Sequence, residues 1–376
     1  MSDVFIISGV RTPIGIGKPN GGLHHYLPVD LAAAVLNEAI RRAEVAPERV
    51  QDVILGCVSP IGEQGGNLAR LAVLRGGLPI SVAGVTLNRM CGSGQQAIHF
   101  AAQAILAQDA DIVLAGGVEM MSRVPLGSDY PQTWAETPYE LPHQGISAGM
   151  LAKKYNLTRD QLDDYAFESH LRAGNALQNG FFTSQMLPLP RPDGSLLTTD
   201  EGVRLPPNCE KMAALKPAFE PNGVITAGNS SQISDGAAAL LLASPQAIGR
   251  YNLNPIARIV TRVVVGSDPT VMLDGPIPAT ELALKRSGLT LNQIDVVELN
   301  EAFACVPLAW LRNFDYDPAR LNPNGGAIAH GHPLGATGAM LMTKLIAELQ
   351  RTNSRYGLQS MCIGHGMATA TIIERL

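Results

Sequence analysis

The feature that most limits the fold of this 376-residue chain is an internal duplication. Three segments of the first half have counterparts in the second: residues 52–55 with 295–298, the glycine-rich turns and following helices at Cys91 and His332, and residues 111–117 with 359–366. Segments that recur in the same order predict two similar structural units that bury a common core. Reactive turns carried by equivalent elements of two such halves are expected to meet at a shared crevice.

Each half is predicted to be α/β. Continuous apolar runs that read as strands lie at residues 4–8, 50–58, 82–88 and 111–115, the last ending at Gly116-Gly117. Residues 31–42 have helical spacing and Asp30 is the predicted N-cap. Strands without polar alternation, separated by helices, indicate a largely parallel and buried sheet.

The middle of the chain has a different character. Residues 119–233 mix prolines, aromatics and polar residues without a strand rhythm, apart from a helical stretch at 159–178. This segment is interpreted as an inserted loop domain because it contains large apolar anchors, namely Trp134, Tyr165, Phe167, Phe181 and Phe182. The predicted organisation is therefore a first half at 1–118 with 234–253, an insert at 119–233, and a second half at 254–376.

Composition excludes several classes of protein. The net charge is −5 and no basic run occurs, which argues against a nucleic-acid partner. The longest apolar run, residues 237–243, is too short to span a membrane, and the first residues lack a signal-peptide pattern. Only 16% of residues are charged and 46% are hydrophobic, which predicts a large core together with a subunit interface. The expected protein is cytoplasmic and oligomeric.

Cys91 is the strongest candidate for chemistry. It lies at a strand-to-helix turn flanked by glycines, where the free N–H groups of the next helix are expected to lower the thiol pKa and favour the nucleophilic thiolate. A buried core cysteine is the alternative. The five cysteines form no CxxC pair, so they are expected to be reduced thiols, and Cys57, Cys209 and Cys305 are interpreted as structural.

His332 lies in a glycine-rich turn within residues 324–338. It is predicted either to orient a thiolate or to hydrogen-bond a thioester oxygen. A histidine that only satisfies a turn carbonyl is the alternative, and His330 fits that structural role better. A metal site is disfavoured because no carboxylate or cysteine lies at ligand spacing from the two histidines.

Two further residues follow strands of the second half. Cys362 lies before Gly364, and a second thiol near the first would suit proton transfer, although a cysteine in a strand is more often a core residue. Asn300 is suited to hold a water or to donate to an oxyanion, although an asparagine after a strand is also ordinary turn chemistry.

Taken together, these motifs resemble the thiolase superfamily. The segments that carry the resemblance occur in the family's order and are residues 88–97, 228–238, 300–303, 324–338 and 362–366. The resemblance extends from Val4 to Leu376. It implies a five-layered αβαβα fold with two duplicated halves and an inserted loop domain that binds coenzyme A.

The resemblance also implies an activity: the reversible thiolysis of 3-ketoacyl-CoA, or condensation of acetyl-CoA, in fatty acid metabolism. Cys91 would carry the acyl group and Cys362 would act as acid and base. His332 would activate Cys91 and, with a water held by Asn300, stabilise the enolate. The backbone N–H groups of Cys91 and Gly364 would form a second oxyanion hole.

Coenzyme A is expected as a substrate rather than a tightly bound cofactor, and no metal is expected. By resemblance, His143 and Ser231 line the pantetheine arm, Arg204 lies near the adenine, and Phe219 and Met272 line the pocket. A homodimer or homotetramer is implied, with acyl-CoA and CoA as the other partners.

Two departures bear on specificity, and two other functions compete. His365 stands where many members have another glycine, and Gln144 stands where short-chain members have Met. A decarboxylating condensing enzyme of the same fold would lack the second thiol, which Cys362 supplies here. A non-catalytic CoA-binding scaffold would not need the complete set of Cys91, Asn300, His332 and Cys362.

Overall fold

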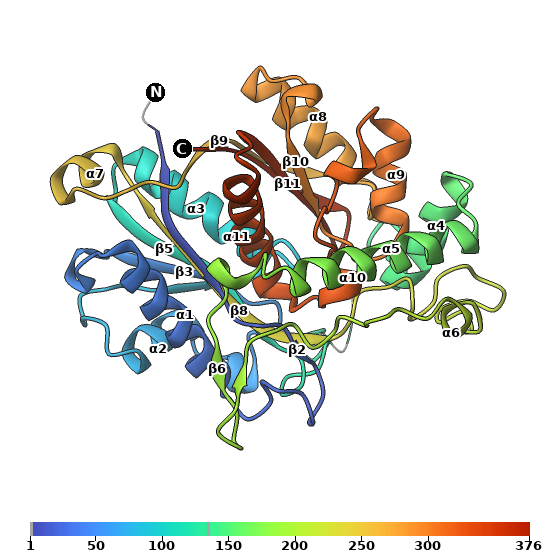
Figure 1. Ribbon diagram of the computed structural model, residues 1–376, viewed down its shortest axis with the longest axis horizontal. Helices are drawn as coiled ribbons and strands as arrows, with labels where there is room; N and C mark the ends of the chain where they lie inside the picture. Colours follow the sequence, from blue (N-terminus) through green and yellow to red (C-terminus); the bar gives the residue numbers. More distant parts are fainter. Residues whose placement is uncertain (1–2, 132, 134–135) are drawn as a thin grey trace.

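A computed structural model describes residues 3–131, 133 and 136–376 of the chain. Its main feature is a ten-stranded mixed sheet (Figure 1). The strands of this sheet are β1 (Phe5–Arg11), β2 (Gly15–Ile16), β3 (Asp52–Gly56), β4 (Val85–Leu87), β5 (Ile112–Met120), β8 (Ser234–Ala243), β9 (Ala257–Gly266), β10 (Val296–Leu299), β11 (Tyr356–Ile363) and β12 (Met367–Arg375). Their order is β10-β11-β12-β9-β1-β8-β5-β3-β4, with β2 paired to β8.

The strand pairings confirm the duplication. In the first half β3 is parallel to β5, β5 is antiparallel to β8, and β8 is antiparallel to β1. In the second half β10 is parallel to β11, β11 is antiparallel to β12, and β12 is antiparallel to β9. The halves join where Phe5 and Ile6 of β1 pair with Arg258 and Ala257 of β9. Each half therefore repeats one four-strand arrangement.

Helices form three further layers. The central layer consists of α3 (Ser93–Ala107) and α11 (Leu334–Thr352), which pack on each other and between the two halves of the sheet. The outer helices are α1 (Pro28–Ala43) and α2 (Leu68–Arg75) on the first half, and α8 (Pro276–Ser287) and α9 (Cys305–Asn313) on the second. Figure 1 shows α11 in the middle of the molecule with the outer helices on opposite sides. The predicted five-layered αβαβα arrangement is thus confirmed.

The segment between β5 and β8 is largely irregular, as the sequence predicted, but it contains more regular structure than one helix. Its helices are α4 (Gln144–Lys154), α5 (Arg159–Gln178) and α6 (Cys209–Ala213), and a short hairpin pairs β6 (Leu189–Pro190) with β7 (Leu196–Leu197). A capping box between Thr158 and Gln161 begins α5 at the predicted residue. Of the apolar anchors predicted for this segment, Phe182 is buried and Trp134 lies outside the described residues.

Three local predictions were wrong. Helix α1 begins at Pro28 after Leu27, so Asp30 lies inside its first turn and pairs with Arg75 instead of capping the helix. Strand β5 continues through Gly116-Gly117 to Met120, because β8 pairs with it along its whole length. Cys209, interpreted as structural, is exposed at the start of α6. Among the described residues no helix is both long and apolar enough to cross a membrane.

Candidate active site

The Cys91 turn and the His332 turn meet because α3 and α11 cross at glycines. A Cβ atom on Gly338 of α11 would lie 2.3 Å from the backbone nitrogen of Gln95 in α3, and one on Gly94 would lie 2.7 Å from the carbonyl oxygen of Gly335. Side chains at these positions would separate the helices. The glycine-rich motif is therefore required for the close approach of two helix N-termini, each of which follows a candidate catalytic residue.

Cys91 is 5% exposed and packs with Leu334 at the start of α11 and with Ile363 at the end of β11. Burial raises the pKa of its thiol to about 11, although the backbone N–H groups of Gly364 and Cys91 and the Gln144 side chain act to lower it. The expected low pKa was wrong: removal of the thiolate from water outweighs the hydrogen bonds available at the turn. The resting thiol is protonated at neutral pH, so a base must take its proton.

His332 can act as that base. It is 4% exposed, and burial lowers its pKa to about 4, so the ring is neutral at neutral pH. Its Nδ1 lies 2.7 Å from Oγ1 of Thr337, and the Thr337 hydroxyl donates its own hydrogen to the carbonyl oxygen of Pro333 at 2.9 Å. Oγ1 must therefore accept from Nδ1–H, which leaves the Nε2 lone pair available for a proton.

Asn300 lies beside the basic nitrogen. Its Nδ2 is 3.4 Å from Nε2 of His332, and the side chain follows β10, where the Asn300 backbone nitrogen donates to Ser360 of β11. The residue is 1% exposed, and its Oδ1 has no hydrogen-bond partner among the described residues. A buried acceptor of this kind is expected to bind a water or a substrate donor. The site thus contains a base and an unsatisfied amide oxygen side by side.

Cys362 is fully buried in β11. Burial raises the pKa of its thiol well above the ordinary value, and the charge that Cys91 would carry as a thiolate raises it further. The backbone N–H of Ala302, two residues after Asn300, acts in the opposite direction. Cys362 is therefore near enough to Cys91 for a charge on one thiol to affect the pKa of the other.

The turn after Cys362 keeps the form that its flanking glycines predicted. Residues 364–366 connect β11 to β12, and Ile363 pairs with Met367 to close the hairpin. His365 adopts the left-handed conformation with φ 61°, next to Gly366 at φ 71°. The Gly364 backbone N–H lies near enough to the Cys91 sulfur to act against the rise in the pKa of that thiol.

Three of the predicted coenzyme A contacts lie around the beginning of α4. The ring of His143, the N-cap of this helix, stacks on Phe219 at 5.2 Å between centroids, and Phe219 meets Phe303 edge-on at 6.0 Å. Met272 is buried in the loop whose Thr270 carbonyl accepts from Ser147 of α4. These residues form an aromatic and apolar wall on the insert side.

The other two predicted contacts are joined through Gln232. Ser231 donates its backbone N–H to Ala302, and the next side chain, Gln232, donates to the Gly202 carbonyl at 3.0 Å. Arg204, two residues further on, is exposed and its backbone N–H bonds to His170. Ser231 thus lies close to the Asn300 block, and Arg204 lies at the protein surface.

Sequence reasoning missed several side chains that shape the site. Glu119 is buried and accepts from the backbone nitrogens of Val58, Ser59 and Gly335 at 2.8, 3.2 and 2.9 Å, so it joins the first half to the start of α11. Burial is also the main reason that its pKa is raised. Tyr130 of the insert is close enough to Cys91 for its own pKa to be affected. A lone acid after an apolar strand was the only sequence signal for Glu119.

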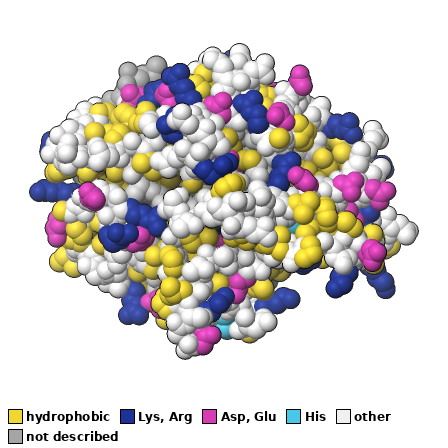
Figure 2. Space-filling view, in the orientation of Figure 1, with side chains coloured by type: hydrophobic (Ala, Val, Ile, Leu, Met, Phe, Trp, Pro, Cys, Tyr) yellow, Lys and Arg dark blue, Asp and Glu magenta, His cyan; other side chains and the backbone are white. Residues whose placement is uncertain are grey.

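A groove elsewhere in the structure does not belong to this site. A groove of about 470 Å³ lies between α5 and α9, lined by Tyr165, Glu301 and Arg312 among others, and Cys91 is not part of it. Among the described residues no group of three His, Cys, Asp or Glu side chains is arranged to hold a metal ion. On the face shown in Figure 2, basic and acidic side chains are interspersed and no continuous basic stripe is seen.

Comparison with known families gives two matches that together span nearly the whole chain. Residues 4–246 match the thiolase N-terminal domain and residues 253–375 match the thiolase C-terminal domain. The division between the two matches falls between β8 and β9, which is where the repeated strand arrangement changes from one half to the other.

Similar proteins and a similar structure cover the full length. The chain is 46% identical to the steroid 3-ketoacyl-CoA thiolase FadA6 of Mycobacterium tuberculosis, over 100% of this chain and 95% of that protein. It is 43% identical to the 3-ketoacyl-CoA thiolase of Idiomarina loihiensis, over the whole of both chains. The crystal structure of the Bacillus anthracis acetyl-CoA acetyltransferase superposes with a TM-score of 0.93 at 38% identity, covering 100% of this chain and 99% of that one.

Proposed function

The chain belongs to the thiolase family, and on that premise we propose that it cleaves 3-ketoacyl-CoA reversibly with CoA, through an acyl group carried on Cys91. The observation that supports this most is the pair of buried thiols, Cys91 and Cys362, together with a neutral histidine, His332, whose basic nitrogen is Nε2 and whose turn meets the Cys91 turn. Two thiols allow one to form the thioester while the other handles a proton on carbon.

In the first half-reaction, Cys91 attacks the 3-keto carbon and its proton passes to Nε2 of His332. The bond between C2 and C3 then breaks and leaves the shortened acyl group on sulfur. Cys362 gives its proton to C2 of the acetyl-CoA enolate, and acetyl-CoA departs. The high pKa of the Cys362 thiol makes it a weak acid, which suits proton transfer to and from C2 of acetyl-CoA, itself a weak carbon acid.

In the second half-reaction, the Cys362 thiolate takes the proton of an incoming CoA thiol. The CoA thiolate attacks the thioester, the shortened acyl-CoA leaves, and the Cys91 thiolate recovers its proton from His332. Each residue ends in its starting protonation state, so the cycle needs no external acid or base. The condensing direction is the same sequence reversed, with Cys362 removing the α-proton of acetyl-CoA.

Negative charge that develops on oxygen has two sets of donors. The backbone N–H groups of Cys91 and Gly364 face the reacting sulfur and suit the oxygen of a tetrahedral intermediate. Asn300 suits the enolate. A water that donates one hydrogen to the unsatisfied Oδ1 of Asn300 can donate its second hydrogen to the enolate oxygen, next to His332. Loss of one oxyanion donor typically lowers kcat by about 10²- to 10³-fold.

Coenzyme A is proposed as a substrate that binds along the insert, with no cofactor held between turnovers. His143, Phe219 and Met272 supply an aromatic and apolar wall for the pantetheine arm, and Ser231 offers a hydroxyl near the Asn300 block. The exposed Arg204 is suited to the phosphates or adenine at the outer end.

The acyl chain and the physiological direction are decided by features other than the catalytic set. The half-buried Gln144, the first residue of α4, acts to lower the pKa of the Cys91 thiol, so a polar side chain lies near the reacting sulfur. Turnover of acetoacetyl-CoA compared with longer 3-ketoacyl-CoA substrates measures chain preference directly. Since an enzyme accelerates both directions, the substrate concentrations in the cell decide which one dominates.

We also propose a cytoplasmic homo-oligomer, a dimer or a tetramer. Among the described strands the edge strand β4 pairs only with β3, and Val85 on it and the nearby Ile80 are 45% and 83% exposed. An exposed edge with apolar side chains favours association with a second copy. Light scattering should give at least twice the chain mass of 39.8 kDa, and a monomer would contradict the proposal.

The proposed activity is tested by intact-mass measurement after mixing the enzyme with acetoacetyl-CoA and no free CoA. The expected result is the mass of one acetyl group on Cys91 and none on a Cys91→Ser variant trapped under the same conditions. Binding without any gain in mass would support a non-catalytic scaffold instead. Activity that depends on a malonyl-type substrate would support a decarboxylating condensing enzyme.

A further inference from the structure

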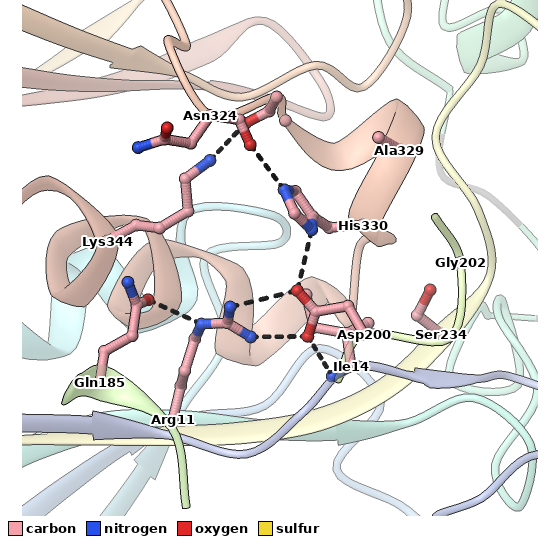
Figure 3. Close-up of polar contacts among 12 residues, drawn as sticks. Arg11, Ile14, Gln185, Asp200, Gly202, Ser234, Asn324, Ala329, His330 and Lys344 are labelled. Atoms are coloured by element: carbon pink, nitrogen blue, oxygen red, sulfur yellow. Dashed lines mark hydrogen bonds and ion pairs between the residues drawn. The ribbon is translucent and has the colours of Figure 1, made fainter. Parts of the chain in front are cut away.

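A buried polar network behind the catalytic turn joins three parts of the chain. Asp200 of the insert accepts two hydrogen bonds from Arg11 of β1, at 2.7 and 3.1 Å, and one from the Ile14 backbone nitrogen at 2.8 Å. Its Oδ2 lies 2.8 Å from Nδ1 of His330 in α10 (Ala327–His330) (Figure 3). Asp200, Arg11 and His330 are each at most 4% exposed. The insert is therefore bound to both halves at this point.

His330 faces an oxygen acceptor at each ring nitrogen. Nε2 lies 2.9 Å from the Asn324 carbonyl oxygen, which confirms the structural role that the sequence favoured. Nδ1 lies 2.8 Å from the Asp200 carboxylate, although this contact lacks hydrogen-bond alignment. The ring therefore has an oxygen acceptor on each side, and a histidine that only satisfied a turn carbonyl would need only the first contact.

The surroundings of His330 hold it from two more directions. The ring of Phe182 meets it edge-on at 5.1 Å, and Arg11 lies over the same Phe182 ring at 5.3 Å. The Gly202 backbone packs closely against the backbone of α10, because a Cβ atom on Gly202 would lie 2.8 Å from the carbonyl oxygens of both Ala329 and His330. These contacts leave the His330 ring and backbone little freedom to move.

His330 is connected to the catalytic histidine by one residue. Gly331 has φ 115°, a conformation that a residue with a side chain rarely adopts, and His332 follows it directly. The backbone N–H of His332 donates to the Gln232 carbonyl at 3.0 Å, while the Gln232 side chain donates to Ile328 and Ala329 at 2.8 and 3.0 Å. The backbone between His330 and His332 is thus held at one end by the contacts of the His330 side chain and at the other end by Gln232.

We propose that His330 is a positioning residue for the reaction: its contact with Asp200 and its bond to Asn324 fix the backbone that carries and orients the His332 ring. This inference rests on the proposed function, because it assigns a purpose to the orientation of His332. Misplacement of a reacting group by about 1 Å can lower the rate on the order of 10²-fold. The effect should appear in kcat rather than in the KM for CoA, because His330 does not line the coenzyme A wall.

The test compares three variants with a matched control. His330→Leu removes both ring nitrogens and keeps an apolar side chain against Phe182. His330→Gln keeps one polar group that can donate. Asp200→Asn keeps the shape of the acceptor and removes its charge. The control is His99→Leu, a buried histidine of α3 whose ring bonds to Thr371. Thermal stability, kcat, the KM for CoA, and the ring-nitrogen NMR signals of His332 in ¹⁵N-histidine-labelled protein are measured for each.

The expected result is a kcat at least about tenfold lower in His330→Leu with an unchanged KM for CoA. Asp200→Asn should lower kcat in the same way and His330→Gln should recover part of the loss. The His332 signals should change from those of the Nδ1–H tautomer to a mixture. His99→Leu should lose stability while it keeps kcat and the His332 signals.

An unchanged kcat and unchanged His332 signals in His330→Leu would overturn the proposal, as would a loss confined to the KM for CoA or to thermal stability. If His330→Leu does not fold, His330→Gln and Asp200→Asn decide by the same criteria. The NMR measurement needs no substrate. A wild-type protein that fails to cleave 3-ketoacyl-CoA would therefore refute the proposed function and leave the His332 signals as a separate test of positioning.

Discussion

Thr337 holds His332 in the tautomer that leaves Nε2 basic. The two side chains meet at 2.7 Å, and because the Thr337 hydroxyl donates to Pro333, it can only accept from Nδ1. The two residues lie on either side of the first turn of α11, so the helix that carries the glycine motif also sets the protonation geometry of this histidine. This relationship leads to the first prediction.

Thr337→Val should lower kcat about 10- to 100-fold, the range typical of a partner that orients a functional histidine. The variant keeps the side-chain shape but removes the acceptor for Nδ1–H. The control is Thr343→Val, which removes the same kind of buried hydroxyl, bonded to Ala339, from the same helix. Steady-state kinetics of both variants check the prediction. An equal loss of kcat in Thr343→Val would contradict it, because the loss would then not depend on the bond between Thr337 and His332.

Gly338→Ala should destabilise the protein by roughly 1–3 kcal/mol and lower activity, because its Cβ atom would press on the backbone of α3. Gly249→Ala in α7 (Pro245–Tyr251) is the control, since no atom of the described residues lies within 4 Å of its Cβ position. That change should stabilise the protein by about 0.5–1 kcal/mol. Denaturant unfolding measures both; a neutral Gly338→Ala would mean that the helix crossing is not tightly packed.

The pH dependence of Cys91 alkylation tests the effect of burial. With a pKa of about 11, the thiolate fraction should rise about tenfold per pH unit through the neutral range and level off only near pH 11. Iodoacetamide modification is followed by mass spectrometry in a Cys209→Ser background, because Cys209 is the exposed thiol. A plateau below pH 8 would instead show that the N–H groups at the turn outweigh burial.

Most of the fold was predictable because the duplication and the apolar runs can be recognised from the order of residues along the chain. The repeat of residues 52–55 at 295–298 indicated equivalent strands, and these are β3 and β10. The end of β5 was not predictable, because pairing with β8, more than a hundred residues away, extends it past two glycines.

Cys91, His332, Cys362 and Asn300 were predicted from their turns, but their electrostatics could not be. In the structure Asn300 lies beside His332, and Cys362 lies near enough to Cys91 for their charges to interact. The high pKa of Cys91 depends on how completely distant segments cover it, which spacing does not encode. The roles of Thr337, Glu119 and His330 likewise depend on contacts with partners that only the folded chain brings within reach.

The central claim is that Cys91 carries the acyl group while Cys362 moves the proton on carbon. Its most direct test is the exchange of the methyl protons of acetyl-CoA in D₂O, measured by NMR, together with the intact mass of the protein. Wild type should exchange the protons and acquire an acetyl group. Cys362→Ala should still acquire the acetyl group on Cys91, although more slowly, because that step breaks no carbon–hydrogen bond and CoA can leave as a thiolate without the Cys362 proton, but it should not catalyse exchange. Exchange at the wild-type rate in Cys362→Ala would contradict the account.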